Sequence, residues 1–183
     1  MSDKKRGRPK KETIKLSSNI ILDCAKEIFL EENKIPSIRK IATKLNIDPM
    51  SIYYYFPNKN ALLESITVSL MEEIYEPTKN NTWKKELELL CKSYLNLLAN
   101  YPGLLKTMLS MDSKSPANVF IEKLQIILST LNLDEKNFST ALSLLADYLH
   151  GVAFAMESNT DNQLTINEID KPLKLYINAI ENL

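Results

Sequence analysis

The feature that most constrains the fold of this 183-residue chain is a pair of prolines, Pro49 and Pro57, that enclose residues 50–56. Proline is accepted in the first turn of a helix but disrupts a helix interior. Because Asp48 is a favoured N-cap residue, the sequence predicts a helix that begins at Pro49 and stops before Pro57. The fold must therefore accommodate one very short helix.

A second short helix is predicted immediately upstream, over residues 37–45. Ser37 is a natural N-cap, and apolar residues recur at helical spacing after it: Ile38, Ile41, Ala42 and Leu45. Asn46 tolerates the left-handed backbone that a tight turn between helices requires. A short helix, a tight turn and another short helix form the sequence pattern of a helix-turn-helix.

Longer helices flank this pair. One is expected over residues 17–33, with its apolar face formed by Ile20, Ile21, Cys24, Ala25, Ile28 and Phe29. Asn58 is expected to cap another, which runs to about residue 76 and is ended by Pro77. Five more helices are predicted, over residues 82–100, 102–112, 116–131, 135–158 and 166–182.

The composition agrees with an all-α fold. The chain has 44% hydrophobic residues, enough for real cores, and three glycines. It has little of the Val, Thr and Gly content of β-sheets. We expect a flexible basic arm over residues 1–16, a three-helix helix-turn-helix domain over 17–64, and a helical domain over 77–183.

Within the short helix after Asp48, Ile52 and Phe56 are four residues apart and share one face, which can anchor the helix to its neighbours. Tyr54 is expected to lie partly in the core, close to that face, and a place in the core is the alternative interpretation for Tyr53 and Tyr55. The opposite side offers hydroxyl groups for base edges or phosphate oxygens and apolar atoms for thymine methyls. It is formed by Pro49, Met50, Ser51, Tyr53 and Tyr55. Lys59, in the first turn of the next helix, is placed to meet a phosphate together with the helix N-terminus.

The stretch from Ser37 to Leu63 resembles the DNA-binding domain of the tetracycline-repressor (TetR) family. The matching positions are Ile41-Ala42, Leu45, Ser51-Ile52-Tyr53, Tyr55-Phe56, Lys59 and Leu62. Asn46 stands where the family usually has glycine, and Pro49-Met50 replaces a more common polar pair. The resemblance implies base or phosphate contacts by Arg39, base contacts by Pro49 and Met50, and further contacts by Ser51, Tyr53, Tyr55 and Lys59, with Tyr53 and Lys59 chiefly on the DNA backbone.

The N-terminal segment Arg6-Gly7-Arg8-Pro9 resembles an AT-hook, an arm that lies in the minor groove of A·T-rich DNA. Arginines are attracted to the strong negative potential of that narrow groove. A solubilising or generally electrostatic tail is the alternative interpretation. Net charge is zero overall, but residues 1–64 carry thirteen Lys/Arg against eight Asp/Glu, whereas residues 65–183 carry ten against fifteen. This asymmetry favours contact of the N-terminal part with a polyanion.

For the C-terminal domain, the resemblance implies a small-molecule pocket and a dimer interface built from the last two long helices. Aromatic, thioether and polar side chains are candidates for the pocket: Trp83, Tyr94, Tyr101, Met108, Met111, Phe120, Asp147, His150, Phe154 and Met156. Each of the apolar ones is alternatively plain core, and Asp147 with His150 is alternatively a pair on one helix face. The interface candidates are Gly151, Ala155, Tyr176, Ile177 and Ile180.

Several protein classes are disfavoured. No paired catalytic residues appear, so an enzyme is not expected, and one histidine with two distant cysteines, Cys24 and Cys91, leaves little for a metal site. No cofactor is implied. The absence of a long apolar run or an apolar leader predicts a cytoplasmic protein without a membrane span, with both thiols free and buried.

The sequence thus predicts a transcriptional regulator, most simply a repressor. It would bind a palindromic operator as a homodimer and be released by an unknown small-molecule inducer. The alternative is an architectural protein that binds A·T-rich DNA without ligand control.

Overall fold

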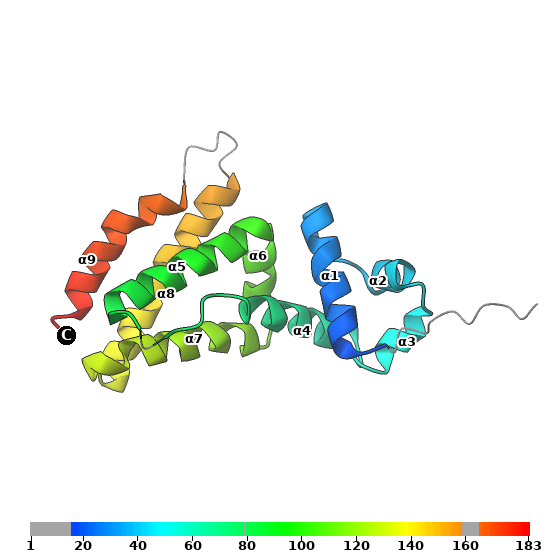
Figure 1. Ribbon diagram of the computed structural model, residues 1–183, viewed down its shortest axis with the longest axis horizontal. Coiled ribbons are helices and arrows are strands. Elements are labelled where there is room, and N and C mark those ends of the chain that lie inside the picture. Colours follow the sequence, from blue (N-terminus) through cyan, green and yellow to red (C-terminus); the bar gives the residue numbers. More distant parts are fainter. Residues whose placement is uncertain (1–15, 79, 159–164) are drawn as a thin grey trace, which may run out of the picture.

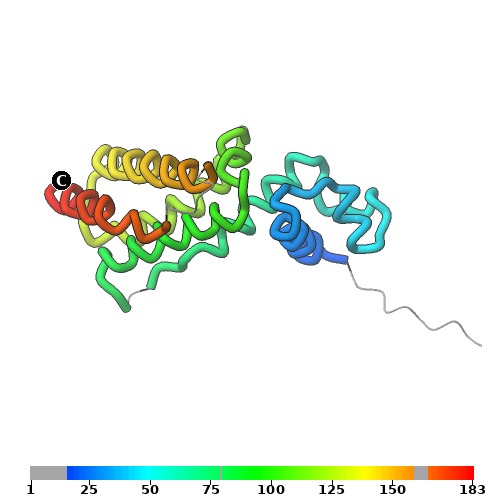
Figure 2. Tube along the Cα trace, turned by 90° about the horizontal axis from the view of Figure 1, so that it is seen from above, coloured from blue at the N-terminus to red at the C-terminus, as the bar shows by residue number. Residues whose placement is uncertain are grey.

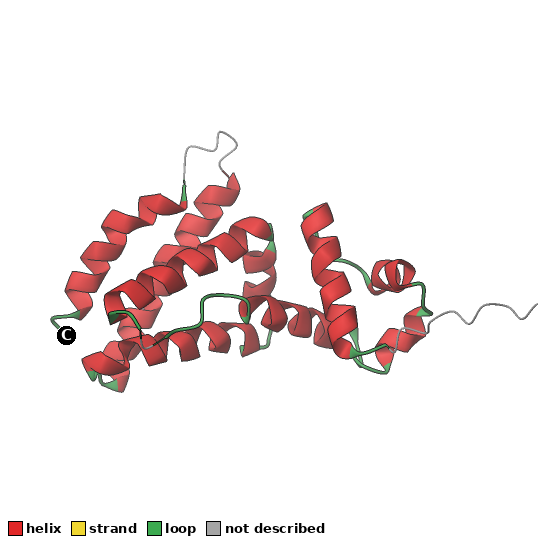
Figure 3. Ribbon diagram, in the orientation of Figure 1, coloured by secondary structure: helices red, strands yellow, loops and turns green. Residues whose placement is uncertain are grey.

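The computed structural model describes residues 16–78, 80–158 and 165–183, and in these ranges every regular element is a helix (Figure 3). The all-α prediction is therefore confirmed. The molecule is elongated, with a small N-terminal lobe and a larger C-terminal lobe joined through one helix, α4 (Figure 1). Arg6 and Arg8 of the predicted arm lie outside the described residues.

The N-terminal lobe contains α1 (Ser18–Glu32), α2 (Ile38–Leu45) and α3 (Pro49–Tyr53), followed by α4 (Lys59–Met71). Each of the four helices begins behind a side chain that accepts a hydrogen bond from a backbone N–H of the first turn. These caps are Ser17, Ser37, Asp48 and Asn58. Local sequence chemistry therefore defines where each helix of this lobe begins.

The core of this lobe is formed by side chains that α1, α2, α3 and α4 direct toward one another. Phe29, Ile41 and Ile52 are each fully buried, and Ile66 of α4 is 1% exposed. In the structure α1 contacts both α2 and α4, and α2 contacts α3. The short α3 is thus held against the lobe by packing, because a five-residue helix is too short to be stable alone.

Helix α4 is shorter than predicted. It ends at Met71 rather than near residue 76. The backbone N–H groups of Glu73 and Ile74 donate to carbonyls three residues earlier instead of four, so the chain leaves the α-helix in a tighter turn. The tighter turn buries Ile74, which is 3% exposed. A proline sets the last position that a helix can reach. Here the helix ends earlier than Pro77 requires, at the turn that buries the apolar side chain of Ile74.

The C-terminal lobe contains α5 (Trp83–Asn100), α6 (Leu104–Leu109), α7 (Ser115–Leu128), α8 (Glu135–Ser158) and α9 (Asp170–Ile180). Two 3₁₀ turns, Ser129–Leu131 and Ile166–Ile169, precede α8 and α9. Helix α5 is central and contacts α7, α8 and α9, while α4 contacts α7. Viewed from above, α8 and α9 run side by side along one side of the lobe (Figure 2).

None of the described helices is long and apolar enough to cross a membrane.

Candidate functional site

The turn between α2 and α3 fixes the direction of α3. Asn46 adopts φ 54°, in the left-handed region, and the N–H of Ile47 donates to the carbonyl of Ala42 at 3.0 Å. Asp48 then accepts from the N–H of Met50 at 2.7 Å. The turn and the cap together leave the chain little freedom between the two short helices.

The two anchor residues of α3 lie inside, and the residues between them lie outside. Ile52 is fully buried and Phe56 is 6% exposed. Met50, by contrast, is 65% exposed, and Tyr53 and Tyr55 are 41% and 39% exposed. Large aromatic and thioether side chains on a surface are unusual for a chain whose other aromatic rings are mostly covered, so this exposed face is a candidate binding surface.

Tyr54 corrects the sequence prediction. It was expected partly in the core, yet it is 89% exposed. At 100° per residue, Tyr54 stands about 200° from Ile52, on the side of the helix farthest from the buried face. The helical spacing of Ile52 and Phe56 was the signal that would have placed Tyr54 on the exposed surface.

Tyr55 has a structural partner within the chain. Its hydroxyl donates to the carbonyl of Leu16, at 2.7 Å. The single proton of the hydroxyl is thereby used, so Tyr55 in this arrangement does not donate to a phosphate. The bond also places Leu16, the first described residue, beside α3.

The basic residues around α3 fall into two groups. Lys40 forms an ion pair with Glu32, and Lys44 pairs with Glu27 and Glu31. Arg39 and Lys59 are exposed and form no ion pair with any described acidic residue. These two cations are therefore available to a phosphate or base.

Lys59 is the first residue of α4, where the backbone N–H groups also point outward. Asn58 occupies one of these groups, because its side chain accepts from the N–H of Ala61 at 2.8 Å. Pro49 and Ser51 are half-buried beside the exposed residues of α3.

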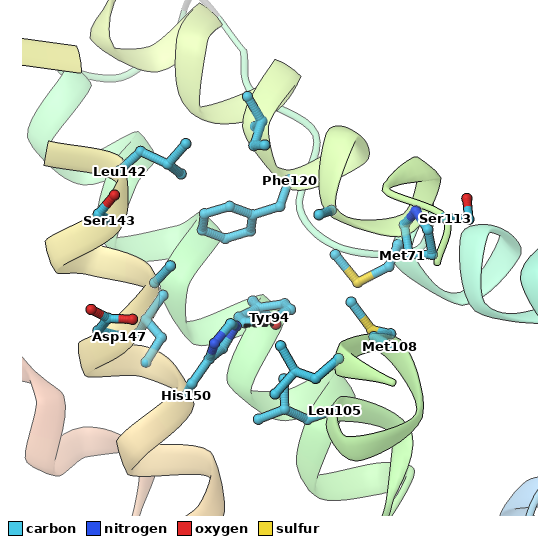
Figure 4. Close-up of a pocket in the computed structure, with 16 residues that line it drawn as sticks. Met71, Tyr94, Leu105, Met108, Ser113, Phe120, Leu142, Ser143, Asp147 and His150 are labelled. Carbon is cyan, nitrogen blue, oxygen red and sulfur yellow. Dashed lines mark hydrogen bonds between the residues drawn. The ribbon is translucent and has the colours of Figure 1, made fainter. Parts of the chain in front are cut away.

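A cavity of about 380 Å³ lies in the C-terminal lobe, between α4, α5, α6, α7 and α8 (Figure 4). Most of its lining is apolar. The lining residues are Met71, Tyr94, Leu105, Met108, Leu109, Ser113, Pro116, Ala117, Phe120, Ile121, Leu142, Ser143, Ala146, Asp147, Leu149 and His150. The volume is in the range of sites for small molecules.

Two polar groups face each other in this cavity. Tyr94 Oη lies 3.1 Å from His150 Nε2, which links α5 to α8. Burial lowers the pKa of His150, although the nearby carboxylate of Asp147 acts in the opposite direction. The imidazole is therefore neutral at pH 7. Burial also raises the pKa of Tyr94.

Five of the predicted pocket residues line this cavity: Tyr94, Met108, Phe120, Asp147 and His150. Figure 4 shows Phe120 and Met108 reaching toward the cavity from different helices, with Tyr94 and His150 side by side. Sequence reasoning missed Met71 at the end of α4, Leu105 near the start of α6 and Ser113 in the loop before α7. No periodic signal marks them, because only the packing of α4, α6 and α7 brings them together.

The other predicted pocket residues do not line this cavity. The ring of Tyr101 packs edge-on against Phe29 of α1, at 5.0 Å between centroids, and so belongs to the junction of the lobes. The sulfur of Met111 lies 3.8 Å from the hydroxyl of Thr67 on α4. Trp83 is half-buried at the start of α5.

Phe154 and Met156 lie on α8, beyond the last lining residue, His150, and Phe154 is 41% exposed. Phe154 is about one turn of helix beyond His150, and Met156 is nearly two turns beyond it. An aromatic or thioether side chain was therefore not enough to predict that a residue lines the cavity.

The predicted interface residues divide between two faces. Gly151 and Ala155 are exposed on α8, and a Cβ atom added to Gly151 would meet nothing within 4 Å. Tyr176, Ile177 and Ile180 are instead buried within the chain, at 8%, 8% and 3% exposure. Their face of α9 packs inward, and the hydroxyl of Tyr176 donates to the carbonyl of Ala141 at 3.0 Å.

The outward face of α8 and α9 is apolar and holds a shallow groove, whose floor is formed by the buried side chains of Leu145 and Tyr176. It is lined by Leu144, Leu145, Tyr148, Pro172, Leu175, Tyr176 and Ala179. Leu144 is 55% exposed and Leu175 72% exposed. Nothing within the described chain covers this face, which continues along α8 to Gly151 and Ala155 by helical spacing.

Two family models match the chain. One, described as bacterial regulatory proteins of the tetR family, matches residues 21–66, which include α2 and α3. The other, described as the tetracyclin repressor-like C-terminal domain, matches residues 76–174.

Among characterised proteins, the chain is 25% identical over 124 residues to the HTH-type transcriptional repressor DrrR1 of Streptomyces coeruleorubidus, covering 64% of this chain and 44% of that protein. It is 28% identical over 92 residues to the class D tetracycline repressor of Escherichia coli, covering 48% of this chain and 42% of that protein. The matched region thus spans less than half the length of these relatives.

Solved structures share the fold. A crystal structure of BioQ with its natural double-stranded DNA operator superposes with a TM-score of 0.72 at 16% identity, covering 92% of this chain and 100% of that one. A TetR variant from Acinetobacter baumannii AYE in complex with minocycline gives 0.68 at 19% identity, covering 92% and 96%. Since one family model covers the helix-turn-helix and the other more than half of the chain, this protein belongs to the tetR family of bacterial regulatory proteins.

Proposed function

We propose that this protein is a transcriptional repressor that binds an operator as a homodimer through α3 and is released by a small molecule held in the C-terminal cavity. The observation that carries this proposal is the exposed face of α3, backed by the buried Ile52 and Phe56. The major groove of B-DNA admits a helix of this kind, and the family membership supports the assignment.

In this arrangement the residues of α3 take different roles. The exposed thioether of Met50 offers an apolar contact to thymine methyl groups, beside Pro49 and Ser51. Tyr53 and Tyr54 offer hydroxyls to phosphates or base edges. Tyr54, which was predicted to lie partly in the core and not to contact DNA, joins the proposed surface because it is the most exposed of the three tyrosines.

The cations Arg39 and Lys59 flank this surface and supply the phosphate contacts. Lys59 stands at the N-terminus of α4, where its ammonium and the helix dipole attract the same phosphate.

The arm carrying Arg6 and Arg8 is proposed to read A·T-rich DNA next to the operator. The support is the hydrogen bond from Tyr55 to the carbonyl of Leu16, which holds the start of the described chain beside α3. Leu16, to which the arm is joined in sequence, therefore lies at the edge of the proposed DNA-binding surface. Removal of residues 1–12 should lower the affinity for A·T-flanked operators more than for G·C-flanked ones.

Dimerisation is proposed through the outward face of α8 and α9. The exposed side chains of Leu144 and Leu175, with the open space above Gly151, allow a second copy to approach closely. Leu175→Glu should convert the dimer to a monomer in sedimentation velocity. Ile126→Glu on α7, at a site 57% exposed, is the matched control that leaves the dimer intact.

Control by ligand requires a link between the cavity and α4. Ser113 lines the cavity, and its hydroxyl donates to the carboxylate of Glu64 on α4. Met71, at the other end of α4, also lines the cavity. A ligand that moves either wall changes the position of α4, and with it the spacing of the two copies of α3.

The deciding experiment is selection of bound DNA from a random pool, followed by footprinting. A short protected palindrome bound with an affinity of ~1–10 nM supports the repressor. Dispersed protection of A·T tracts without a palindrome would instead support the architectural alternative and contradict the proposal.

A further inference from the structure

The charge in the cavity has one sign. Among its described lining residues, Asp147 is the one with a formal charge at pH 7, because His150 is neutral and neither lysine nor arginine lines the wall. Asp147 lines the cavity from α8, one turn from Ser143, and is itself exposed, so it lies where the cavity meets solvent.

The interior of the cavity suits a soft, polarisable body. Met71 and Met108 bring two thioethers, and Phe120 brings an aromatic ring that lies 5.0 Å from the ring of Tyr94, centroid to centroid. Aromatic faces attract cations and methionine sulfur adapts to irregular ligands. The interior of the cavity and the carboxylate of Asp147 therefore both favour a ligand that has a polarisable apolar body and a positive charge.

We propose that the cavity selects a lipophilic organic cation: an aromatic or alkyl body among Phe120, Met108 and Met71, with an ammonium or similar group beside Asp147. This inference rests on the ligand-controlled repressor proposed above and names the class of its ligand. The carboxylate of Asp147 attracts the positive charge of the ligand. The Tyr94–His150 pair is uncharged and offers the ligand a hydrogen-bonding group without requiring a counter-charge.

An anionic ligand of the same size is disfavoured by the same residues. Its charge would stand next to Asp147 with no guanidinium or ammonium in the lining to compensate it. Burying an unpaired charge is costly, so an anion would have to leave its charged group in water. An uncharged ligand would fill the interior but gain nothing from the carboxylate.

The test uses three probes of one shape. They are 6-phenylhexyl-trimethylammonium, its uncharged analogue with a tert-butyl group in place of trimethylammonium, and 6-phenylhexanesulfonate. Isothermal titration calorimetry on the full chain, free of DNA, is expected to give the ammonium a Kd about tenfold lower than that of the uncharged analogue. The sulfonate is expected to bind more weakly than either. The factor of ten is modest because solvent screens an exposed carboxylate.

Two variants assign the effect to one residue. Asp147→Asn keeps the size of the side chain and should reduce the preference for the ammonium over its uncharged analogue to less than twofold, while the uncharged probe binds as before. Glu157→Gln removes a negative charge from an exposed position on the same helix, outside the cavity, and should leave the preference intact. An effect of overall net charge would appear in both variants.

Equal binding of the ammonium and the sulfonate, a preference that survives Asp147→Asn, or no binding by any of the three probes would overturn the assignment of the ligand class. Affinity for the selected operator is measured separately by fluorescence anisotropy. A chain that binds the cation selectively but no DNA would contradict the proposed repressor and leave the ligand class standing, so the two failures are distinguishable.

Discussion

The two lobes use their aromatic residues in opposite ways. In the N-terminal lobe, three tyrosines at and just after the end of α3 are exposed, and Tyr54 is 89% exposed. In the C-terminal lobe, Tyr94 and Phe120 are buried and face a cavity that five helices enclose. The first arrangement presents a surface to a large partner, and the second offers an enclosed volume to a small one.

The difference also concerns how each site is held in place. The exposed face of α3 depends on local devices: the Asp48 cap, the left-handed Asn46 and the anchor residue Ile52. The cavity depends on the packing of helices that are distant in sequence. Substitutions should therefore affect the two sites independently, except at residues that join them.

The largest expected effect comes from Ile52→Ala. Ile52 is fully buried, so its truncation should lower the free energy of unfolding by about 3 kcal/mol and loosen α3. Leu87→Ala, at a fully buried position of α5, should cost a similar amount. Urea denaturation measures both, and DNA affinity under folded conditions should fall for Ile52→Ala alone. Equal loss of DNA affinity in both variants would refute the independence of the lobes.

Lys59→Ala should weaken DNA binding about tenfold at low salt and flatten the slope of log affinity against log salt by about one unit, because one phosphate contact is lost. Lys106→Ala on α6, an exposed lysine of the other lobe, is the matched control. Fluorescence anisotropy across a salt series gives both quantities. An unchanged slope for Lys59→Ala would remove its phosphate contact from the proposal.

Two asparagines with left-handed backbones allow a matched test of the turns. Asn46 has φ 54° and Asn132 has φ 50°, one in each lobe. Replacement of either by alanine should destabilise the chain by about 1 kcal/mol, because a Cβ-bearing residue without a local polar group is disfavoured there. Thermal unfolding should show similar losses, but Asn46→Ala should also weaken DNA binding. Loss of DNA affinity in Asn132→Ala would argue against a local role for the α2–α3 turn.

Ser113→Ala tests the connection between the lobes. Loss of the hydrogen bond to Glu64 should leave cation binding nearly unchanged but reduce the ligand-induced drop in DNA affinity by about fivefold. Ser110→Ala, three residues earlier and outside the cavity, should retain the full drop. The measurement is operator affinity with and without saturating ammonium probe. If Ser113→Ala shows undiminished release, the signal travels by another route.

The smallest effect concerns pH. Burial lowers the pKa of His150 in the folded chain, whereas the unfolded histidine binds a proton near pH 6.5. The unfolded state then holds more protons as the pH falls through this value, so the free energy of unfolding decreases. His150→Gln should reduce this slope in denaturation curves recorded from pH 7.5 to 5.5. We expect His150, in the C-terminal lobe, to cause this dependence of the free energy of unfolding on pH. If the His150→Gln variant kept the original slope, another titratable group would be its cause.

Much of the N-terminal lobe follows from its sequence. The caps and the apolar spacing placed α1, α2 and the starts of α3 and α4 to within a residue or two, because each is decided by side chains close to the backbone groups they satisfy. The end of α3 was predicted too late, because the helix stops at Tyr53 and not just before Pro57. The error at Tyr54 was one of helical phase, and the error at the end of α4 arose at Ile74, which is buried by a tighter turn before Pro77.

Prediction was weaker wherever distant segments had to meet. Helical periodicity marked Tyr176 and Ile177 as apolar but did not distinguish the face of α9 that packs on its own chain from the face left open. Likewise, Tyr101 and Met111 have the chemistry of pocket residues but pack against α1 and α4 instead.

The sequence by itself determined the helices of this protein and the chemistry exposed on α3, because capping, turn formation and amphipathic spacing act over a few residues. Tertiary structure alone decided which walls enclose the cavity, that Asp147 lies where the cavity meets solvent, and that Ser113 touches α4. These outcomes depend on how whole helices pack, and packing is set by contacts summed over the entire core.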